Sequence, residues 1–208
     1  MPVTLVFGDA EATPDEAARN VFEVDFWGAV HVSQEAVRFF REENSPQGGR
    51  LIQNSAAVGL VTREGLAFYG AAKHALEAFT ETLSKEVNSA WNIKITSVLP
   101  GGFVTDITTS GQLIPQHPAY ADDSNAVALV RKMFIENASM EAMNRLGCGD
   151  PAKGVQKIYK LSKLPDPPLR VLLGRDSNYM VKEWHTQLGR ETEEYAHWSD
   201  SLGFEVDK

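Results

Sequence analysis

Two residues four positions apart, Tyr69 and Lys73, are the pair in this sequence best suited to acid/base chemistry. On a helix, side chains at this spacing lie on one face, within a few ångströms of each other. A tyrosine phenol has a pKa of about 10, and a neighbouring ammonium group favours the phenolate and lowers that pKa. The small residues Gly70, Ala71 and Ala72 between them leave room for a flat ligand. The spacing alone also occurs by chance on surface helices, so the surrounding elements decide its meaning.

The elements that must position this pair alternate along the chain. Helical spacing predicts one long helix over residues 14–43, with Thr13 as N-cap and a bend at Gly28, and a second over 65–90 that carries the pair. Strands are expected at residues 50–54, 93–98 and 169–173, and further helices at 124–145, at 151–163 and from about 176. Strands separated by helices predict a doubly wound parallel α/β sheet, in which ligands bind beyond the carboxyl ends of the strands.

Composition bounds the class of protein. The 208 residues, 43% of them hydrophobic, are enough for one domain, and the formal net charge of −8 without a dense Lys/Arg run excludes nucleic acid as an expected partner. No apolar stretch approaches the roughly 20 residues of a membrane-spanning helix. A single cysteine, Cys148, and the lack of a signal-peptide pattern predict a cytoplasmic protein. The five histidines show no metal-ligand spacing, so no metal is expected.

Five ordered blocks of this sequence resemble the short-chain dehydrogenase/reductase family. The helix with Ala-Phe-Tyr-Gly-Ala-Ala-Lys is similar to that family's Tyr-x-x-x-Lys helix, and the segment 49–60 resembles its strand and catalytic serine loop. The other blocks are residues 20–28, 93–105 and 167–174. The resemblance implies a Rossmann-like fold and hydride transfer between NADP or NAD, with NADP slightly favoured, and a small carbonyl or alcohol substrate.

The resemblance also implies roles for individual residues. Tyr69 gives its proton to the carbonyl oxygen as hydride arrives, while Lys73 lowers the pKa of the phenol and bonds the nicotinamide ribose. Both therefore count as catalytic and cofactor-binding residues. The further cofactor contacts that the family pattern implies are Pro100, Gly101, Phe103 and Thr105.

Parts of the family pattern are absent. The sequence has neither the glycine-rich turn that presents backbone N–H groups to the pyrophosphate nor the Asn-Asn-Ala-Gly element. We therefore expect residues 1–208 to be a single truncated Rossmann domain, lacking the first strands, with residues 3–7 as a candidate substitute edge strand. The expected consequence is weak or no binding of NADPH or NADH by this chain alone.

Two departures affect the chemistry directly. The family's serine stands thirteen residues before the tyrosine, where this sequence has Ala56, and Ser55 is one step earlier. Ser55 is a candidate catalytic substitute if the loop is rewound, and otherwise an ordinary strand-end serine. Asp25 stands where the family has an asparagine, and its negative charge would raise the pKa of Tyr69.

Two functions remain open from the sequence. The first is an NAD(P)-dependent oxidoreductase whose substrate is selected by the region 106–150. The second is a non-catalytic remnant that acts as a binding or heteromer-forming partner. Family members pair through the long helices, here 14–43 and 65–90, so a homodimer or homotetramer is expected.

Overall fold

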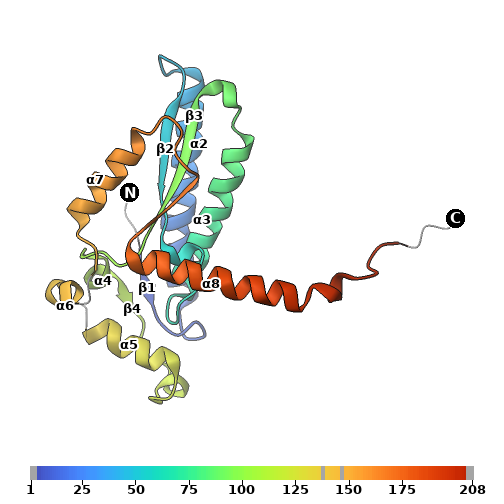
Figure 1. The fold of residues 1–208 in the computed structure, drawn as a ribbon. Coiled ribbons are helices and arrows are strands. Elements are labelled where there is room, and N and C mark those ends of the chain that lie inside the picture. The colour runs from blue at the N-terminus through green and yellow to red at the C-terminus, as the bar shows by residue number, and fades with distance from the viewer. Residues whose placement is uncertain (1–3, 137–138, 146–147, 205–208) are drawn as a thin grey trace.

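The computed structural model describes residues 4–136, 139–145 and 148–204, and its centre is a parallel sheet (Figure 1). The three strands are β2 (Gly49–Asn54), β3 (Ile93–Pro100) and β5 (Arg170–Leu173), in the order β2-β3-β5. Gly49 pairs with Ile93 and Ser97 pairs with Arg170. β3 is buried along almost its whole length, as expected of the central strand of a parallel sheet. The predicted parallel α/β fold is confirmed.

Helices connect the strands and cover the sheet. Residues 15–42 form one nearly continuous helical segment made of α1 (Asp15–Phe22), the π-helical turn η1 (Glu23–Trp27) and α2 (Gly28–Glu42). α2 and the next helix, α3 (Ala67–Glu86), pack against β2 and β3. In Figure 1, α7 (Pro151–Ser162) lies on the opposite side of the strands from α3. α8 (Arg175–Glu194) starts at the end of β5 and extends away from the body.

Two details of the long N-terminal helix differ from the prediction. The helix is capped by Pro14 without a side-chain hydrogen bond, because the Thr13 hydroxyl instead donates to the carbonyl of Asp9 at 2.9 Å. The irregularity expected at Gly28 lies one turn earlier, in η1, and Gly28 itself has ordinary helical angles. The π-helical turn contains Asp25, which is buried.

The segment near the N-terminus forms a second small sheet. β1 (Val6–Phe7) pairs in parallel with β4 (Gln112–Leu113), and the hydrogen bond from Ile114 N to Phe7 O extends this pairing. The interpretation of residues 3–7 as an edge strand of the main sheet is therefore wrong for Val6 and Phe7, while Val3 lies outside the described residues. Val6 and Phe7 are both buried, and they pair with the segment that follows β3 instead of with the main sheet.

Short elements complete the chain between and after these units. They are η2 (Ala57–Gly59), η3 (Ser89–Trp91), α4 (Ile107–Ser110), η4 (Pro118–Tyr120), α5 (Ala126–Glu136), α6 (Met140–Arg145) and η5 (Ala196–Ser199).

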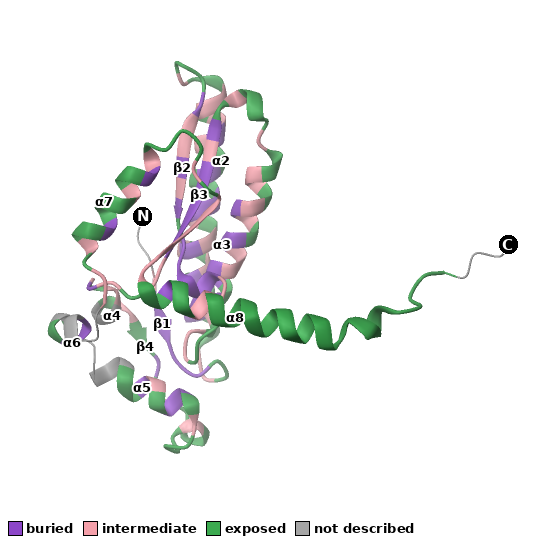
Figure 2. Ribbon diagram, in the orientation of Figure 1, coloured by how far each residue is buried: buried purple, intermediate pink, exposed green. Residues whose placement is uncertain are grey.

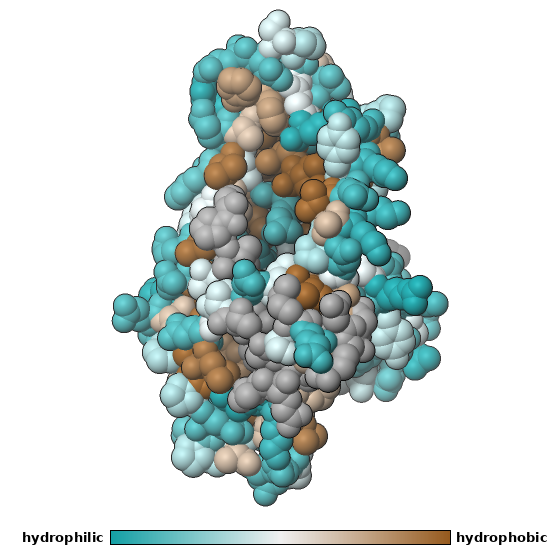
Figure 3. Space-filling view, turned by 90° about the vertical axis from the view of Figure 1, so that its left-hand side faces the viewer, coloured by the Kyte–Doolittle hydropathy of each residue, from teal (hydrophilic) through white to brown (hydrophobic). Residues whose placement is uncertain are grey.

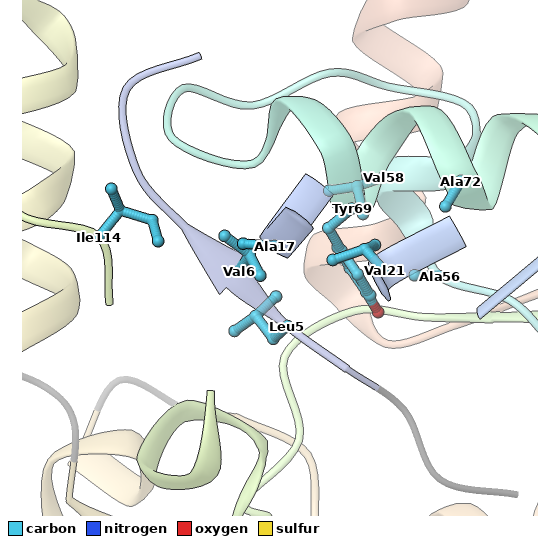
Figure 4. Close-up of a cluster of buried hydrophobic side chains, with 9 residues drawn as sticks. All are labelled: Leu5, Val6, Ala17, Val21, Ala56, Val58, Tyr69, Ala72 and Ile114. Carbon is cyan, nitrogen blue, oxygen red and sulfur yellow. The ribbon is translucent and has the colours of Figure 1, made fainter. Parts of the chain in front are cut away.

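Buried and exposed residues divide the molecule clearly (Figure 2). One apolar cluster lies between α2 and the sheet and includes Val37, Leu51 and Ile95. A second cluster joins β1, α1 and the start of α3, and it includes Tyr69 (Figure 4). The second half of α8 is exposed throughout.

The face seen in Figure 3 carries apolar side chains in separate patches among hydrophilic ones. None of the described helices is both long enough and apolar enough to span a bilayer.

Candidate active site

Tyr69 and Lys73 lie together in the first turns of α3, as their spacing predicts. The Lys73 ammonium is 5.6 Å from the centroid of the Tyr69 ring. Tyr69 is 7% exposed and Lys73 2%. Figure 4 shows the phenol ring among apolar side chains from β1, α1 and η2, including Leu5, Val21 and Val58. The two polar groups therefore meet in a largely dry environment, where charges act strongly on each other.

Lys73 lies between the end of β2 and the π-helical turn. Its ammonium donates to the carbonyl of Asn54 at 3.4 Å and lies 4.0 Å from Oδ1 of Asp25. The backbone N–H of Thr4 donates to the same carboxylate oxygen at 3.1 Å. Oδ2 of Asp25 is buried and has no hydrogen-bond partner among the described residues.

Burial dominates the electrostatics of this group of residues. It raises the pKa of Tyr69, and the charge of Asp25 raises it further. It also raises the pKa of Asp25, although Lys73 and the N–H of Thr4 oppose that rise. The pKa of Lys73 is lowered by burial against the opposing charges of Asp25 and Glu77. Tyr69 is therefore held as a protonated phenol near neutral pH, which is the form that donates a proton.

A mostly apolar cavity with a volume of about 370 Å³ borders Tyr69. Tyr69 and Ala56 form part of its wall, together with Pro100 and Gly101 at the carboxyl end of β3. Other walls come from β1, from the segment after β3 and from α8. They include Leu5, Phe7, Leu66, Ile107, Val130, Met133, Met143, Cys148, Asp176 and Met180. The cavity thus lies beyond the carboxyl ends of the strands, as expected of a doubly wound sheet.

The structure brings Ala56, and not Ser55, to the wall of this cavity. Ser55 is 3% exposed, and its hydroxyl has no hydrogen-bond partner among the described residues. That hydroxyl points toward Gly59, where an added Cβ would lie 2.9 Å from it. Successive residues at a strand end face opposite sides, which explains the difference between the two neighbours. A catalytic role for Ser55 would require the loop to change conformation.

The predicted cofactor contacts divide in the same way. Pro100 and Gly101 line the cavity, whereas Phe103 and Thr105 are not among its lining residues. Phe103 forms an isolated β-bridge with Gly149, and its ring occupies the space where a Cβ on Gly149 would lie. Its position indicates a packing role that fixes the segment after β3.

Asp176 also lines the cavity, just beyond the carboxyl end of β5. Its Oδ2 accepts a hydrogen bond of 2.6 Å from the backbone N–H of Gly102. A Cβ on Gly101 would lie 2.1 Å from the same carboxylate, so a larger residue here would displace the Asp176 side chain. Asp176 therefore joins the start of α8 to the turn that ends β3.

The residues present fit one end of a nicotinamide dinucleotide. Lys73, Asn54 and Asp25 line a second cavity of about 200 Å³ beside the edge of β2, and the polar groups there suit a ribose hydroxyl. The glycine-rich phosphate-binding turn is absent from the sequence. The fit is thus to the nicotinamide ribose and not to the pyrophosphate. The described residues contain no cluster of three His, Cys, Asp or Glu side chains that could hold a metal ion.

A parallel α/β sheet with a tyrosine and a lysine at the carboxyl ends of its strands defines a Rossmann-like protein. Residues 4–113 match the family model of short chain dehydrogenases, and the chain belongs to that family. The predicted resemblance is thereby confirmed.

Curated and solved relatives agree with this assignment. The chain is 33% identical to an uncharacterised oxidoreductase of Schizosaccharomyces pombe over 94% of its own length and 63% of that protein. It is 31% identical to the oxidoreductase calM of Penicillium decumbens over 80% of its length and 54% of that protein. A short-chain dehydrogenase structure from Streptomyces avermitilis matches with a TM-score of 0.81 and 26% identity, over 97% of this chain and 68% of the other. The chain thus spans less than two thirds of the length of these two curated relatives.

Proposed function

We propose that this chain carries the catalytic and substrate-binding part of an NAD(P)-dependent oxidoreductase that interconverts a carbonyl and an alcohol. The observation that carries the proposal is the position of Tyr69. Its phenol lies in the wall of a mostly apolar cavity, and the Lys73 ammonium is 5.6 Å from its ring. A protonated phenol at that point can donate to the oxygen of a carbonyl that enters the cavity.

A bound nicotinamide cofactor would supply or accept the hydride. Tyr69 would hold the carbonyl oxygen by a hydrogen bond and transfer its proton as negative charge develops there. Lys73 would stabilise the resulting phenolate and bind the nicotinamide ribose from its position beside Asn54. The backbone at Pro100 and Gly101 would lie against the nicotinamide, while the apolar wall excludes water.

Asp25 affects how readily the phenol of Tyr69 gives up its proton. Its charge raises the pKa of Tyr69, so the phenol holds its proton more firmly than it would beside an asparagine. A more firmly held proton disfavours the phenolate, which is the base needed for alcohol oxidation. The same firmly held proton makes the phenol a weaker acid for carbonyl reduction, so we infer that Asp25 slows proton transfer in both directions relative to an asparagine.

The cavity supports an apolar substrate, and residues 106–150 supply much of its wall. Ile107, Val130, Met133 and Met143 from that region all line the cavity. The proposed substrate is a mostly apolar ketone or aldehyde that fits about 370 Å³. NADP or NAD both fit this proposal, because the described residues contain no group that would discriminate between them.

A homodimer is also part of the proposal. The exposed face of α2 carries Val32 and Phe39, which are 52% and 41% exposed and border a shallow apolar groove. Exposed apolar side chains on a long helix favour packing against a second copy. A cytoplasmic location and the single-domain organisation of residues 1–208 stay predictions from the sequence.

The second candidate function is a non-catalytic binding partner. One observation favours it: Ala56 stands in the cavity wall where a serine hydroxyl would assist the phenol. A chain of this kind would keep the cavity and bind small apolar molecules without turnover.

One experiment separates the two functions. The purified chain is incubated with millimolar NADPH or NADH and a panel of apolar ketones, and cofactor oxidation is followed by absorbance at 340 nm. Tyr69→Phe is compared with Tyr120→Phe, which changes a partly exposed tyrosine outside the cavity wall whose hydroxyl donates to Glu11. Reduction that Tyr69→Phe abolishes and Tyr120→Phe retains supports the enzyme. Reduction that persists in Tyr69→Phe refutes the proposed role of the phenol, and the lack of any turnover favours the binding partner.

A further inference from the structure

A buried arginine outside the Tyr/Lys pair joins three separate segments of the chain. Arg131 of α5 is 6% exposed. Its Nη1 donates to the carbonyl of Ile114 at 2.7 Å, and its Nη2 lies 3.7 Å from Oδ2 of Asp9. The centre of the guanidinium is 5.5 Å from the centroid of the Phe7 ring. Arg131 thus connects α5 with β1, with the loop after β1 and with the segment after β4.

Asp9 is equally buried and is tied to the same region. It is 2% exposed, and its Oδ2 accepts a hydrogen bond of 2.8 Å from the backbone N–H of His117. Oδ1 of Asp9 and Nε and Nη2 of Arg131 are buried without a hydrogen-bond partner among the described residues. Burying two charges with such incomplete pairing costs more than it returns in stability, compared with apolar side chains of similar volume. A gain in stability therefore does not explain well why Arg131 and Asp9 are buried together. Their position next to the cavity gives a better explanation.

The pair adjoins two elements, α5 and β1, that both supply walls of the 370 Å³ cavity. Val130 and Met133 flank Arg131 on α5, and both line the cavity. Phe7, which stacks against the guanidinium, lines it from β1. A shift of Arg131 relative to Phe7 would change the width of the cavity between these walls.

We propose that Arg131, held by Asp9, is a positioning residue that sets the width of the cavity and thereby its affinity for apolar ligands. Arg131 acts through Val130, Met133 and Phe7 and does not touch the reacting atoms. Only one part of this inference rests on the proposed function, namely that the apolar ligand is the substrate. The width of the cavity and its affinity for an apolar probe are independent of turnover.

The chain offers a matched control at the next position of the same helix. Lys132 is exposed and pairs with Asp123 at 2.5 Å, also on the surface. Lys132→Met therefore removes a cation and an ion pair from α5 without touching the cavity wall. Arg131→Met removes the buried guanidinium while keeping a side chain of comparable length.

The first measurement is the affinity for prodan, a fluorescent naphthyl ketone, by titration of each variant. We expect Arg131→Met and Asp9→Asn each to weaken prodan binding about tenfold, which is about 1.4 kcal/mol. Lys132→Met should leave it unchanged, and Val130→Trp, which fills the cavity, should abolish it. Unchanged affinity in Arg131→Met, or equal weakening in Lys132→Met, overturns the inference.

The second measurement is hydrogen exchange of residues 112–133 by mass spectrometry. Arg131→Met should lose protection in this segment, while protection in α3 is kept, because the fold as a whole remains. Loss of protection throughout the chain would mean a general folding defect and would count against a positioning role.

Turnover supplies the third measurement and separates the two proposals. For a ketone that the wild type reduces, Arg131→Met should raise KM about tenfold with kcat within about twofold, and Arg131→Lys should recover part of the loss. If no variant turns over but prodan affinity falls as expected, the proposed function fails and the positioning role holds. If turnover is present with KM and prodan affinity unchanged in Arg131→Met, the positioning role fails alone.

Discussion

The buried pair of Lys73 and Asp25 gives the sharpest quantitative prediction. Replacing Lys73 by Met removes the ammonium from a site in which both side chains are almost inaccessible to solvent. Asp25 then keeps one hydrogen bond, from the N–H of Thr4, and its other oxygen already has no partner among the described residues. The variant therefore strands a buried carboxylate.

The magnitude follows from the 4.0 Å separation of the two charged groups. At an effective dielectric constant near 20, two unit charges at that distance attract each other by about 4 kcal/mol. Removing one partner of a buried pair costs about 3–5 kcal/mol. Because burial raises the pKa of Asp25, its carboxyl can take up a proton when the ammonium is lost, so we expect the lower end, about 3 kcal/mol.

The assay is a double-mutant cycle by urea unfolding at pH 7, monitored by circular dichroism. We expect Asp25→Asn to cost about 1–3 kcal/mol and the double variant to lie within about 2 kcal/mol of the wild type, because no stranded charge remains. The matched control is Lys85→Met, which breaks a surface pair with Glu81 on the same helix and should cost less than about 1 kcal/mol. Additivity of the two single changes within about 0.5 kcal/mol would refute the reasoning.

Three further predictions concern neighbouring positions. Ala56→Ser should raise kcat/KM for ketone reduction about tenfold, because it adds a hydroxyl at the cavity wall. Ser55→Ala should leave kcat/KM unchanged, because the Ser55 side chain does not line the cavity. Loss of turnover in Ser55→Ala would contradict this placement of the Ser55 side chain. Gly65→Ala should lower the free energy of unfolding in urea by about 1–3 kcal/mol. Gly65 has a φ of +77°, and an added Cβ would lie 2.4 Å from the ring of Phe7. A variant as stable as the wild type would argue against this packing. Burial raises the pKa of Asp25 in the folded state above its value in the unfolded state. The stability that protonated Asp25 contributes is therefore fully present below the unfolded pKa of about 3.9. It is lost as pH rises through the folded-state pKa. Urea unfolding between pH 4 and 8 should therefore show the wild type losing stability relative to Asp25→Asn as pH rises, and the opposite trend would contradict the sign.

The sequence predicted the parts of the fold that depend on local periodicity. The helix with Tyr69 and Lys73 and the strands β2, β3 and β5 were expected within a few residues of their observed bounds, because each has a clear apolar pattern. The shared face of Tyr69 and Lys73 follows from the helical repeat alone.

Contacts between distant segments could not be predicted in this way. β1 and β4 have two residues each, too few for any alternation to be detected, yet β1 pairs with β4 and supplies Phe7 to the wall of the cavity. Asp9 and Arg131 come together only through the fold, and neither stands in a motif. Whether Ser55 reaches the cavity depends on which face of the strand end points toward it. A pattern of residue types does not by itself determine that orientation.

The segment that precedes the first long helix affects the chemistry in two ways that depend on each other. Thr4 donates its backbone N–H to Asp25, while Leu5 and Val6 pack in the apolar cluster that contains Tyr69. The packing desolvates the phenol, and the hydrogen bond favours the charged form of the carboxylate that acts on it. Displacing residues 4–6 would therefore expose both the phenol of Tyr69 and the carboxylate of Asp25 to water. Both changes would lower the pKa of Tyr69, because hydration favours the phenolate and solvent screens an exposed carboxylate. The balance between proton donor and base at this site is thus set by a segment that does not itself supply an acid or a base.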